Sequence, residues 1–290
     1  MSFKELFAEE EFREVFNEVE RFADGMLTEY NQWLENIPLS GENKEIFDAV
    51  WGNIEFSGGE IYILDSPLLQ RLRKIKQLGL AYFVYCGCDY SRYYHTLGVT
   101  YLADRMAAAI NRCDLEITEE DKNYFRAVAR LAAIFHDSGH MFLSHVSEHY
   151  FGKSPLYKRN TLINNFMEKF EKMAGKRTAL HELLGCMIVN TRAVYQLLTI
   201  VAKYIKGLNG SRATDIDNLV EYISSLIVGV PVDRESLPYS CIINGPIDAD
   251  KCDYLSRDSH VTRVPVAVDV SRITQKFPSR TLKLAPMTLN

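Results

Sequence analysis

The sequence predicts a mainly α-helical protein with one small β-hairpin near its N-terminus. Along most of the 290 residues, apolar side chains recur three and four positions apart, which is the spacing of amphipathic helices. Residues 49–64 differ, because two β-favouring runs flank Ser57-Gly-Gly-Glu60 and so indicate a hairpin. No apolar run approaches the roughly 18 residues that a membrane-spanning helix needs. We therefore expect a soluble globular protein with no membrane partner, built as one large domain with an appendage.

The appendage is residues 1–40, where apolar residues at helical spacing with acids between them predict an amphipathic helical arm on a domain of residues 41–290. Next along the chain, Asp65-Ser66-Pro67 is a helix-start pattern, and the apolar stripe after it ends at Gly79. The same periodicity predicts helices near residues 94–111, 119–136, 144–151, 178–190, 192–206, 215–228 and 247–258. Short extended stretches are expected at 264–268 and 281–284.

Charge and cysteine content limit the class of ligand and the cellular location that we expect. The net charge is −5, but residues 1–35 carry −7, which leaves +2 on the rest of the chain. A body so close to neutral lacks the basic stripe of a broad nucleic-acid groove, so a small anionic ligand is the better expectation. The N-terminus lacks the order of a signal peptide, and six cysteines do not form a disulfide framework in a chain of this length. These features predict a reduced, cytoplasmic protein.

Four of the seven histidines fall within fourteen residues, at His136, His140, His145 and His149. Because the segment before them is apolar, these imidazoles need hydrogen-bond partners or a metal, unless they form a surface cluster. His136 and Asp137 are adjacent at the predicted end of a helix, where both can reach one divalent ion. A hydrolytic metal site also needs ligands from elsewhere in the chain, and the candidates are His95 and Asp250.

Four blocks of sequence, in order, match a known family. They are Gln70-Arg-Leu-Arg-Lys-Ile-Lys-Gln-Leu-Gly79, Ser91-Arg-Tyr-Tyr-His-Thr-Leu-Gly-Val99, His136-Asp-Ser-Gly-His140 with Ser144-His145, and Asp248-Ala-Asp-Lys-Cys-Asp-Tyr-Leu-Ser-Arg-Asp258. From about residue 45 to 275 the chain resembles the HD-domain deoxynucleotide triphosphohydrolases, a branch of the HD superfamily of metal-dependent phosphohydrolases. The resemblance implies an HD-domain helical bundle that hydrolyses a deoxynucleoside triphosphate to a deoxynucleoside and triphosphate. It also implies a homo-oligomer.

The resemblance further implies a role for individual residues. It implies one divalent metal ion, which could be iron, manganese, zinc or magnesium, and additional magnesium bound to the nucleotide. The implied metal ligands are His95, His136, Asp137 and Asp250. The implied catalytic residues are His140, His145, Glu148 and His181. The implied substrate contacts are Gln77 and Leu78 near sugar and base, Arg92 and Lys251 on phosphate, Tyr254 against the sugar where a 2′-hydroxyl would lie, and Asp258 on the 3′-hydroxyl.

Departures from the family pattern leave the substrate open. The loop Cys86-Gly-Cys-Asp-Tyr90 puts an acid near the expected triphosphate position, where small residues are usual. Relatives continue through a helical C-terminal region, so either that region is missing from these 290 residues or the protein is minimal. Three alternatives therefore remain: an HD phosphohydrolase for monophosphates, cyclic nucleotides or alarmones; a nucleotide-sensing module with little turnover; and a single-strand nuclease.

Overall fold

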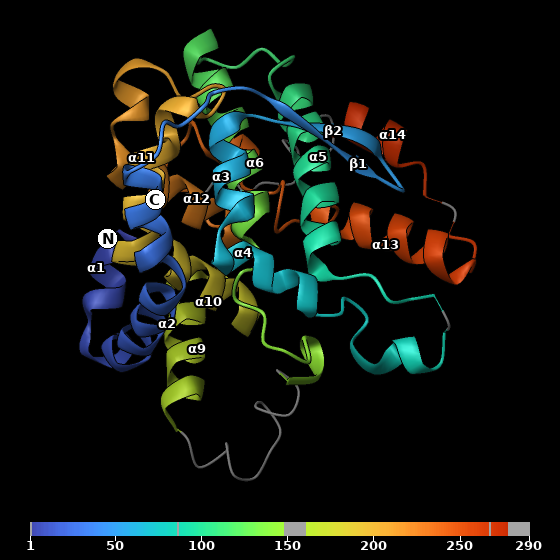
Figure 1. The fold of residues 1–290 in the computed structure, drawn as a ribbon, viewed down its shortest axis with the longest axis horizontal. Coiled ribbons are helices and arrows are strands. Elements are labelled where there is room, and N and C mark those ends of the chain that lie inside the picture. Colours follow the sequence, from blue (N-terminus) through green and yellow to red (C-terminus); the bar gives the residue numbers. More distant parts are fainter. Residues whose placement is uncertain (1, 86, 148–160, 267, 278–290) are drawn as a thin grey trace.

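Helices dominate the computed structural model, which describes residues 2–85, 87–147, 161–266 and 268–277 (Figure 1). In these ranges the sheet structure is limited to one antiparallel pair of strands. The predicted fold class, mainly α with a small N-terminal hairpin, is confirmed. None of the described helices is long and apolar enough to cross a membrane alone, although the bent pair 180–189 and 192–204 meets the length and composition test.

The N-terminal segment forms α1 (Phe3–Ala8) and α2 (Glu10–Glu35), as the amphipathic pattern predicts. Ser2 caps α1 through a reciprocal pair of hydrogen bonds with Glu5. The apolar face of α2 packs against α10 (Leu180–Val189) and α11 (Arg192–Val201) (Figure 1). Its buried side chains belong to the same hydrophobic core as the rest of the chain. The division at residue 40 stays a prediction.

The hairpin lies earlier in the chain than predicted. Strands β1 (Lys44–Asp48) and β2 (Gly52–Phe56) pair in the register Lys44 to Phe56, and the expected second strand belongs instead to α3 (Gly58–Asp65). Glu60 accepts hydrogen bonds from the backbone N–H and the hydroxyl of Ser57, which caps a helix start. The glycines of this segment allow close packing and do not form a turn. A Cβ on Gly59, for example, would lie only 2.4 Å from Ile205 Cγ1. The run at 61–64 looks strand-like because α3 is buried almost all round.

The predicted helix from residue 68 to 78 is wrong beyond its first turns. Helix α4 (Pro67–Gln70) passes into the 3₁₀ helix η1 (Arg71–Lys74), after which Ile75 is extended. The Gln77 N–H donates to the Tyr90 carbonyl at 3.1 Å, and the Arg92 N–H donates to the Ile75 carbonyl at 2.9 Å. These bridging bonds replace the helical ones. A further 3₁₀ helix, η2 (Gly79–Phe83), follows.

The body of the protein is a set of packed helices, most of them at predicted positions. They are α5 (Arg92–Ile110), α6 (Glu119–Phe135), α10, α11, α12 (Ile216–Val228) and α13 (Ala249–Thr262). Helix α5 packs against α6 and α13, and α6 packs against α12 (Figure 1). Shorter 3₁₀ helices are η3 (Ala202–Tyr204), η4 (Gly210–Ala213) and η5 (Leu237–Tyr239). This packing brings the C-terminal end of α6 and the N-terminal end of α13 to the middle of the molecule, beside α5.

Several predictions for the remaining segments fail or lie outside the described residues. Helices α9 (Thr161–Ala174) and α14 (Val270–Gln275) are present but were not predicted. Residues 145–147 are helical, and the rest of the helix predicted at 144–151 lies outside the described ranges. The extended stretch predicted around Pro265 forms no strand in its described part, and residues 281–284 are not described.

Candidate metal centre and active site

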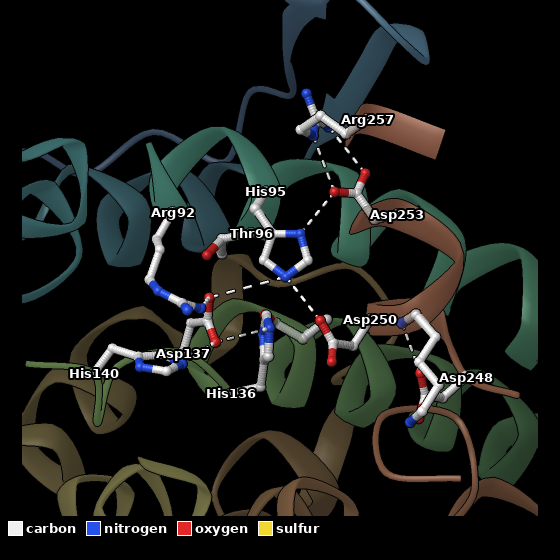
Figure 2. A network of polar contacts seen from close by, with 12 residues as sticks. Arg92, His95, Thr96, His136, Asp137, His140, Asp248, Asp250, Asp253 and Arg257 are labelled. Carbon is white, nitrogen blue, oxygen red and sulfur yellow. Dashed lines mark hydrogen bonds and ion pairs between the residues drawn. The ribbon is translucent and has the colours of Figure 1, made fainter. Parts of the chain in front are cut away.

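His95, His136 and Asp137 converge between α5 and α6. Each offers one ligand atom, and these atoms lie within 4.8 Å of one another. His95 projects from the first turn of α5, and the other two residues follow the last turn of α6, whose apolar sequence buries it up to Phe135. Asp250 enters from the first turn of α13 and places Oδ1 2.8 Å from His95 Nε2 (Figure 2). The four predicted ligands therefore meet in one network.

The donor atoms of this group suit a divalent ion. His136 Nδ1 lies 2.6 Å from the carbonyl oxygen of Ala133, to which it donates, so the Nε2 lone pair faces Asp137. Among the described residues, that Nε2 is buried without a hydrogen-bond partner. Imidazole nitrogens combined with carboxylate oxygens form the ligand set of a hydrolytic centre, and a bound ion would satisfy the buried nitrogen.

A chain of buried polar contacts supports His95 from behind. Its Nδ1 lies 2.7 Å from Asp253 Oδ2, and Asp253 in turn accepts two hydrogen bonds from Arg257 at 2.9 and 3.0 Å (Figure 2). Arg257 also bonds Asp48, at the end of β1, at 2.8 Å. The indole N–H of Trp51, in the hairpin turn, donates to Asp253 at 2.5 Å. The hairpin is thus connected to a predicted metal ligand.

Helix α5 admits this network because residue 98 is glycine. A Cβ on Gly98 would lie 1.9 Å from Asp253 Oδ1 and 2.4 Å from Arg257 Nη2. Any side chain there would push α13 away from α5.

Arg92 supplies the main positive charge at the centre. Its Nη1 lies 2.6 Å from Asp137 Oδ2, both side chains are buried, and its Nε donates to Ser144 Oγ at 3.0 Å. Burial alone would raise the pKa of the Asp137 carboxyl, but attraction to Arg92 and the neighbouring histidines outweighs burial and lowers this pKa well below its usual range. Burial likewise disfavours a charged His95, yet hydrogen bonds to Asp250 and Asp253 raise its pKa to about 10.

Three further predicted histidines form a second group beside the first. The ligand atoms of His140, His145 and His181 also lie within 4.8 Å of one another. The rings of His140 and His181 stack with centroids 3.9 Å apart, and the His145 ring meets His140 edge-on at 4.9 Å. Burial lowers the pKa of His140 to about 3, although Asp137 opposes this shift. His145 is exposed, and His181 is half-buried. Glu148, predicted to orient these rings, lies outside the described residues.

Arg71 is a contributor to the site that sequence reasoning did not assign. Its guanidinium donates to the backbone carbonyl of Ser138 and, at 2.9 Å, to that of His140. It thereby fixes the turn after the predicted metal ligands His136 and Asp137. The signal was present, because Arg71 belongs to the first matching block, but nothing in the sequence pairs it with residues almost seventy positions away.

Two of the predicted substrate contacts, Lys251 and Tyr254, lie on α13 near Asp250 and are partly exposed. Lys251 is tied to Asp248 and to the carbonyl of Gly245, with its side chain still 40% exposed. Tyr254 is half-buried, and burial together with the nearby charge of Asp250 raises its pKa.

Tyr90 bonds both Gln77 and Asp258, and it is another residue to which the sequence analysis gave no role. The Gln77 N–H donates to the Tyr90 carbonyl, and the Tyr90 hydroxyl donates to the Asp258 carboxylate. Leu78 follows in the same half-buried turn. Tyr90 belongs to the loop that departs from the family pattern.

Comparison with known proteins identifies the family of the chain. A sequence model described as the HD domain matches residues 92–258, which hold all four predicted ligands. A deoxynucleoside triphosphate triphosphohydrolase SAMHD1 homolog of Dictyostelium discoideum is 28% identical over 238 residues, covering 80% of this chain and 39% of its own. The deoxynucleoside triphosphate triphosphohydrolase SAMHD1 of Xenopus laevis is 30% identical over 223 residues, covering 73% and 33%. The chain spans about two fifths or less of the length of these relatives.

A structural relative is a hypothetical protein from Aquifex aeolicus. It superposes on this chain with a TM-score of 0.57 at 24% identity, covering 81% of this chain and 51% of its own. At that level of identity the likeness shows a shared fold. The matched sequence model spans more than half of the chain and includes the residues that meet in Figure 2. The chain belongs to the HD domain family.

Proposed function

We propose that the protein is a metal-dependent phosphohydrolase that converts a deoxynucleoside triphosphate to a deoxynucleoside and triphosphate. The observation that carries the proposal is the convergence of buried His95, His136 and Asp137 with the partly exposed Asp250, with a group of histidines directly beside them. The relatives described as deoxynucleoside triphosphate triphosphohydrolases support the substrate class. The expected homo-oligomer and the magnesium carried by the nucleotide are part of the same proposal.

A divalent ion held by the four ligands would supply Lewis acidity and an activated water for attack at phosphorus. The side chains around it would bind the phosphates of the substrate. The Arg92 guanidinium lies against Asp137, so it can meet a phosphate oxygen bound at the same centre. Lys251 follows the ligand Asp250 and keeps its ammonium partly exposed, which suits the distal phosphates.

His145 is the better proton donor to the leaving 5′-oxygen. A general acid must carry its proton at the working pH and lie within hydrogen-bond reach of the leaving oxygen. His140 is buried, which disfavours the charged imidazolium, whereas His145 is exposed at the edge of the same group. His140 then acts as a neutral neighbour that positions His145 and the phosphate.

The proposal is tested by incubating the protein with each of the four deoxynucleoside triphosphates and with GTP, in manganese or magnesium, and separating all products by anion exchange. We expect deoxynucleoside and intact triphosphate, with activity lost in Asp137→Ala together with the bound metal. Far-UV circular dichroism checks that the variant remains helical. Monophosphate with pyrophosphate would reject cleavage at the nucleoside side. Nucleotide binding without turnover would instead favour a sensing module.

A further inference from the structure

His140 and His145 lie on one segment after α6 and His181 lies on α10, yet the three side chains meet closely. His140 lies in the turn after α6, His145 begins the next helical turn, and His181 is the second residue of α10. Their ring centroids are 3.9 to 5.3 Å apart, and one nitrogen of each lies within 4.8 Å of the others. We call these three residues the histidine trio.

The backbone is shaped to bring the trio together. A Cβ on Gly139 would lie 2.0 Å from the carbonyl oxygen of His181 and 2.6 Å from the backbone nitrogen of Gly185. The turn that carries His140 can therefore contact the first turn of α10 only because residue 139 is glycine. Arg71 holds the same turn through the carbonyls of Ser138 and His140.

The trio differs chemically from the first centre. Its three donors are all imidazole nitrogens, whereas the first centre combines two imidazoles with two carboxylates. A set of three histidines with an open fourth position suits zinc, while carboxylate-containing sets also accept magnesium and manganese. The trio is therefore expected to favour zinc over magnesium and manganese more strongly than the first centre does.

The trio is also open to solvent and coupled to the first centre. His145 is exposed and His181 is half-buried, so an ion can enter without displacing core side chains. On the inner side, Asp137 Oδ1 lies 3.3 Å from both His136 Nε2 and His140 Nε2, which puts this carboxylate between the two groups.

We propose that the histidine trio is a second metal site, selective for zinc, and that zinc bound there inhibits the protein. Inhibition follows because an imidazole nitrogen that coordinates zinc has no proton to give to a leaving oxygen. The inhibitory part rests on the function proposed above, whereas the binding part does not.

Binding is measured in proteins whose first centre is disabled, because zinc could otherwise fill both sites. We expect His136→Ala and, as a second background, Asp250→Ala each to retain one zinc ion per chain after gel filtration, quantified by mass spectrometry. Adding His181→Ala or His145→Ala to either background lowers zinc affinity about tenfold or more. Adding His260→Ala, an exposed histidine near the end of α13, leaves the affinity unchanged and is the matched control. Loss of zinc from both backgrounds, or equal affinity without His181, would overturn the site.

Inhibition is measured on the unmodified chain with saturating manganese. Added zinc reduces deoxynucleotide hydrolysis, a chelator restores it, and His260→Ala responds like the unmodified protein. Hydrolysis that is insensitive to zinc, under conditions where the trio binds it, overturns the inhibitory part. If no nucleotide is hydrolysed at all, the proposed function fails while the zinc measurement still decides the binding part.

Discussion

Asp253 receives hydrogen bonds from three parts of the fold: His95 on α5, Arg257 on its own helix and Trp51 in the hairpin. It is fully buried, and although burial opposes ionisation, its contacts with His95 and Arg257 lower its pKa. A carboxylate behind a metal-binding imidazole fixes the tautomer and the ring orientation, and it raises the basicity of the ligand. Asp253 is therefore a positioning residue for the centre.

Asp253→Asn should lower metal affinity by about 10- to 100-fold, because the amide removes the negative charge behind His95. Chelator competition monitored by a metal-sensitive dye measures the change. Asp258→Asn is the control, since Asp258 lies on the same helix but bonds Tyr90 instead of a ligand. Equal metal affinity in the two variants would contradict the role given to Asp253.

Tyr254→Ala should relax discrimination against ribonucleotides. Tyr254 lies four residues after Asp250 on α13, so both side chains face the same side of the helix. Removing the ring opens room for a 2′-hydroxyl and should reduce the ratio of dGTP to GTP turnover by up to about 100-fold. His260→Ala on the same helix should keep the ratio. An unchanged ratio in Tyr254→Ala would place the sugar elsewhere.

At the scale of the elements, the turn after α6, which carries His140, has no room for a side chain at residue 139. Gly139→Ala should destabilise the fold by about 1–3 kcal/mol, because the new methyl group overlaps the backbone of α10. Urea unfolding followed by circular dichroism measures the difference. Gly25→Ala is the matched control, because open space surrounds Gly25 in α2 and alanine favours helix there by up to about 1 kcal/mol. Similar stability of both variants would show that the turn can relax.

Elements with a regular apolar stripe and a clear start signal could be predicted from sequence. Helices α5, α6 and α12 lie within about two residues of their predicted bounds. Helix α3 was predicted as a strand because burial on all sides removes the helical stripe, and the stretch after α4 was predicted as helix because its competing hydrogen bonds come from residues 90–92. Local periodicity contains no information about such partners.

The same limit applies to the site. The four candidate ligands could be proposed from the His-Asp pair and the order of the blocks, and the structure brings them together. Asp48 and Trp51 could not, because their contacts with Arg257 and Asp253 span about 200 residues of sequence. Their partners depend on how the hairpin packs against α5 and α13, which no local pattern encodes.

At the scale of the whole molecule, the candidate centre joins segments from both halves of the chain. The proposed ligands come from α5, the end of α6 and α13, and the hairpin completes their support. An ion bound only by the folded protein must therefore stabilise the whole fold. At an ion concentration 100 times its Kd the gain is about 2.7 kcal/mol.

Metal removal should accordingly lower the thermal midpoint of the unmodified protein. We expect a chelator to lower Tm in differential scanning fluorimetry, and added manganese to restore it. His136→Ala lacks one ligand of this centre, so its Tm, measured on protein freed of zinc, should not respond to either addition. A chelator effect of the same size in His136→Ala would mean that the stabilising ion binds outside this centre.

Trp51 gives the molecule a built-in optical reporter. Its indole N–H is bonded to Asp253, its ring stacks on Tyr101 with centroids 5.6 Å apart, and only one other tryptophan, the half-exposed Trp33, is present. Indole emission responds to the local electric field. When an ion draws electron density from His95, the field at Asp253 and hence at the indole changes. A Trp33→Phe protein would therefore signal occupancy of the centre by its own fluorescence, in real time and without a dye.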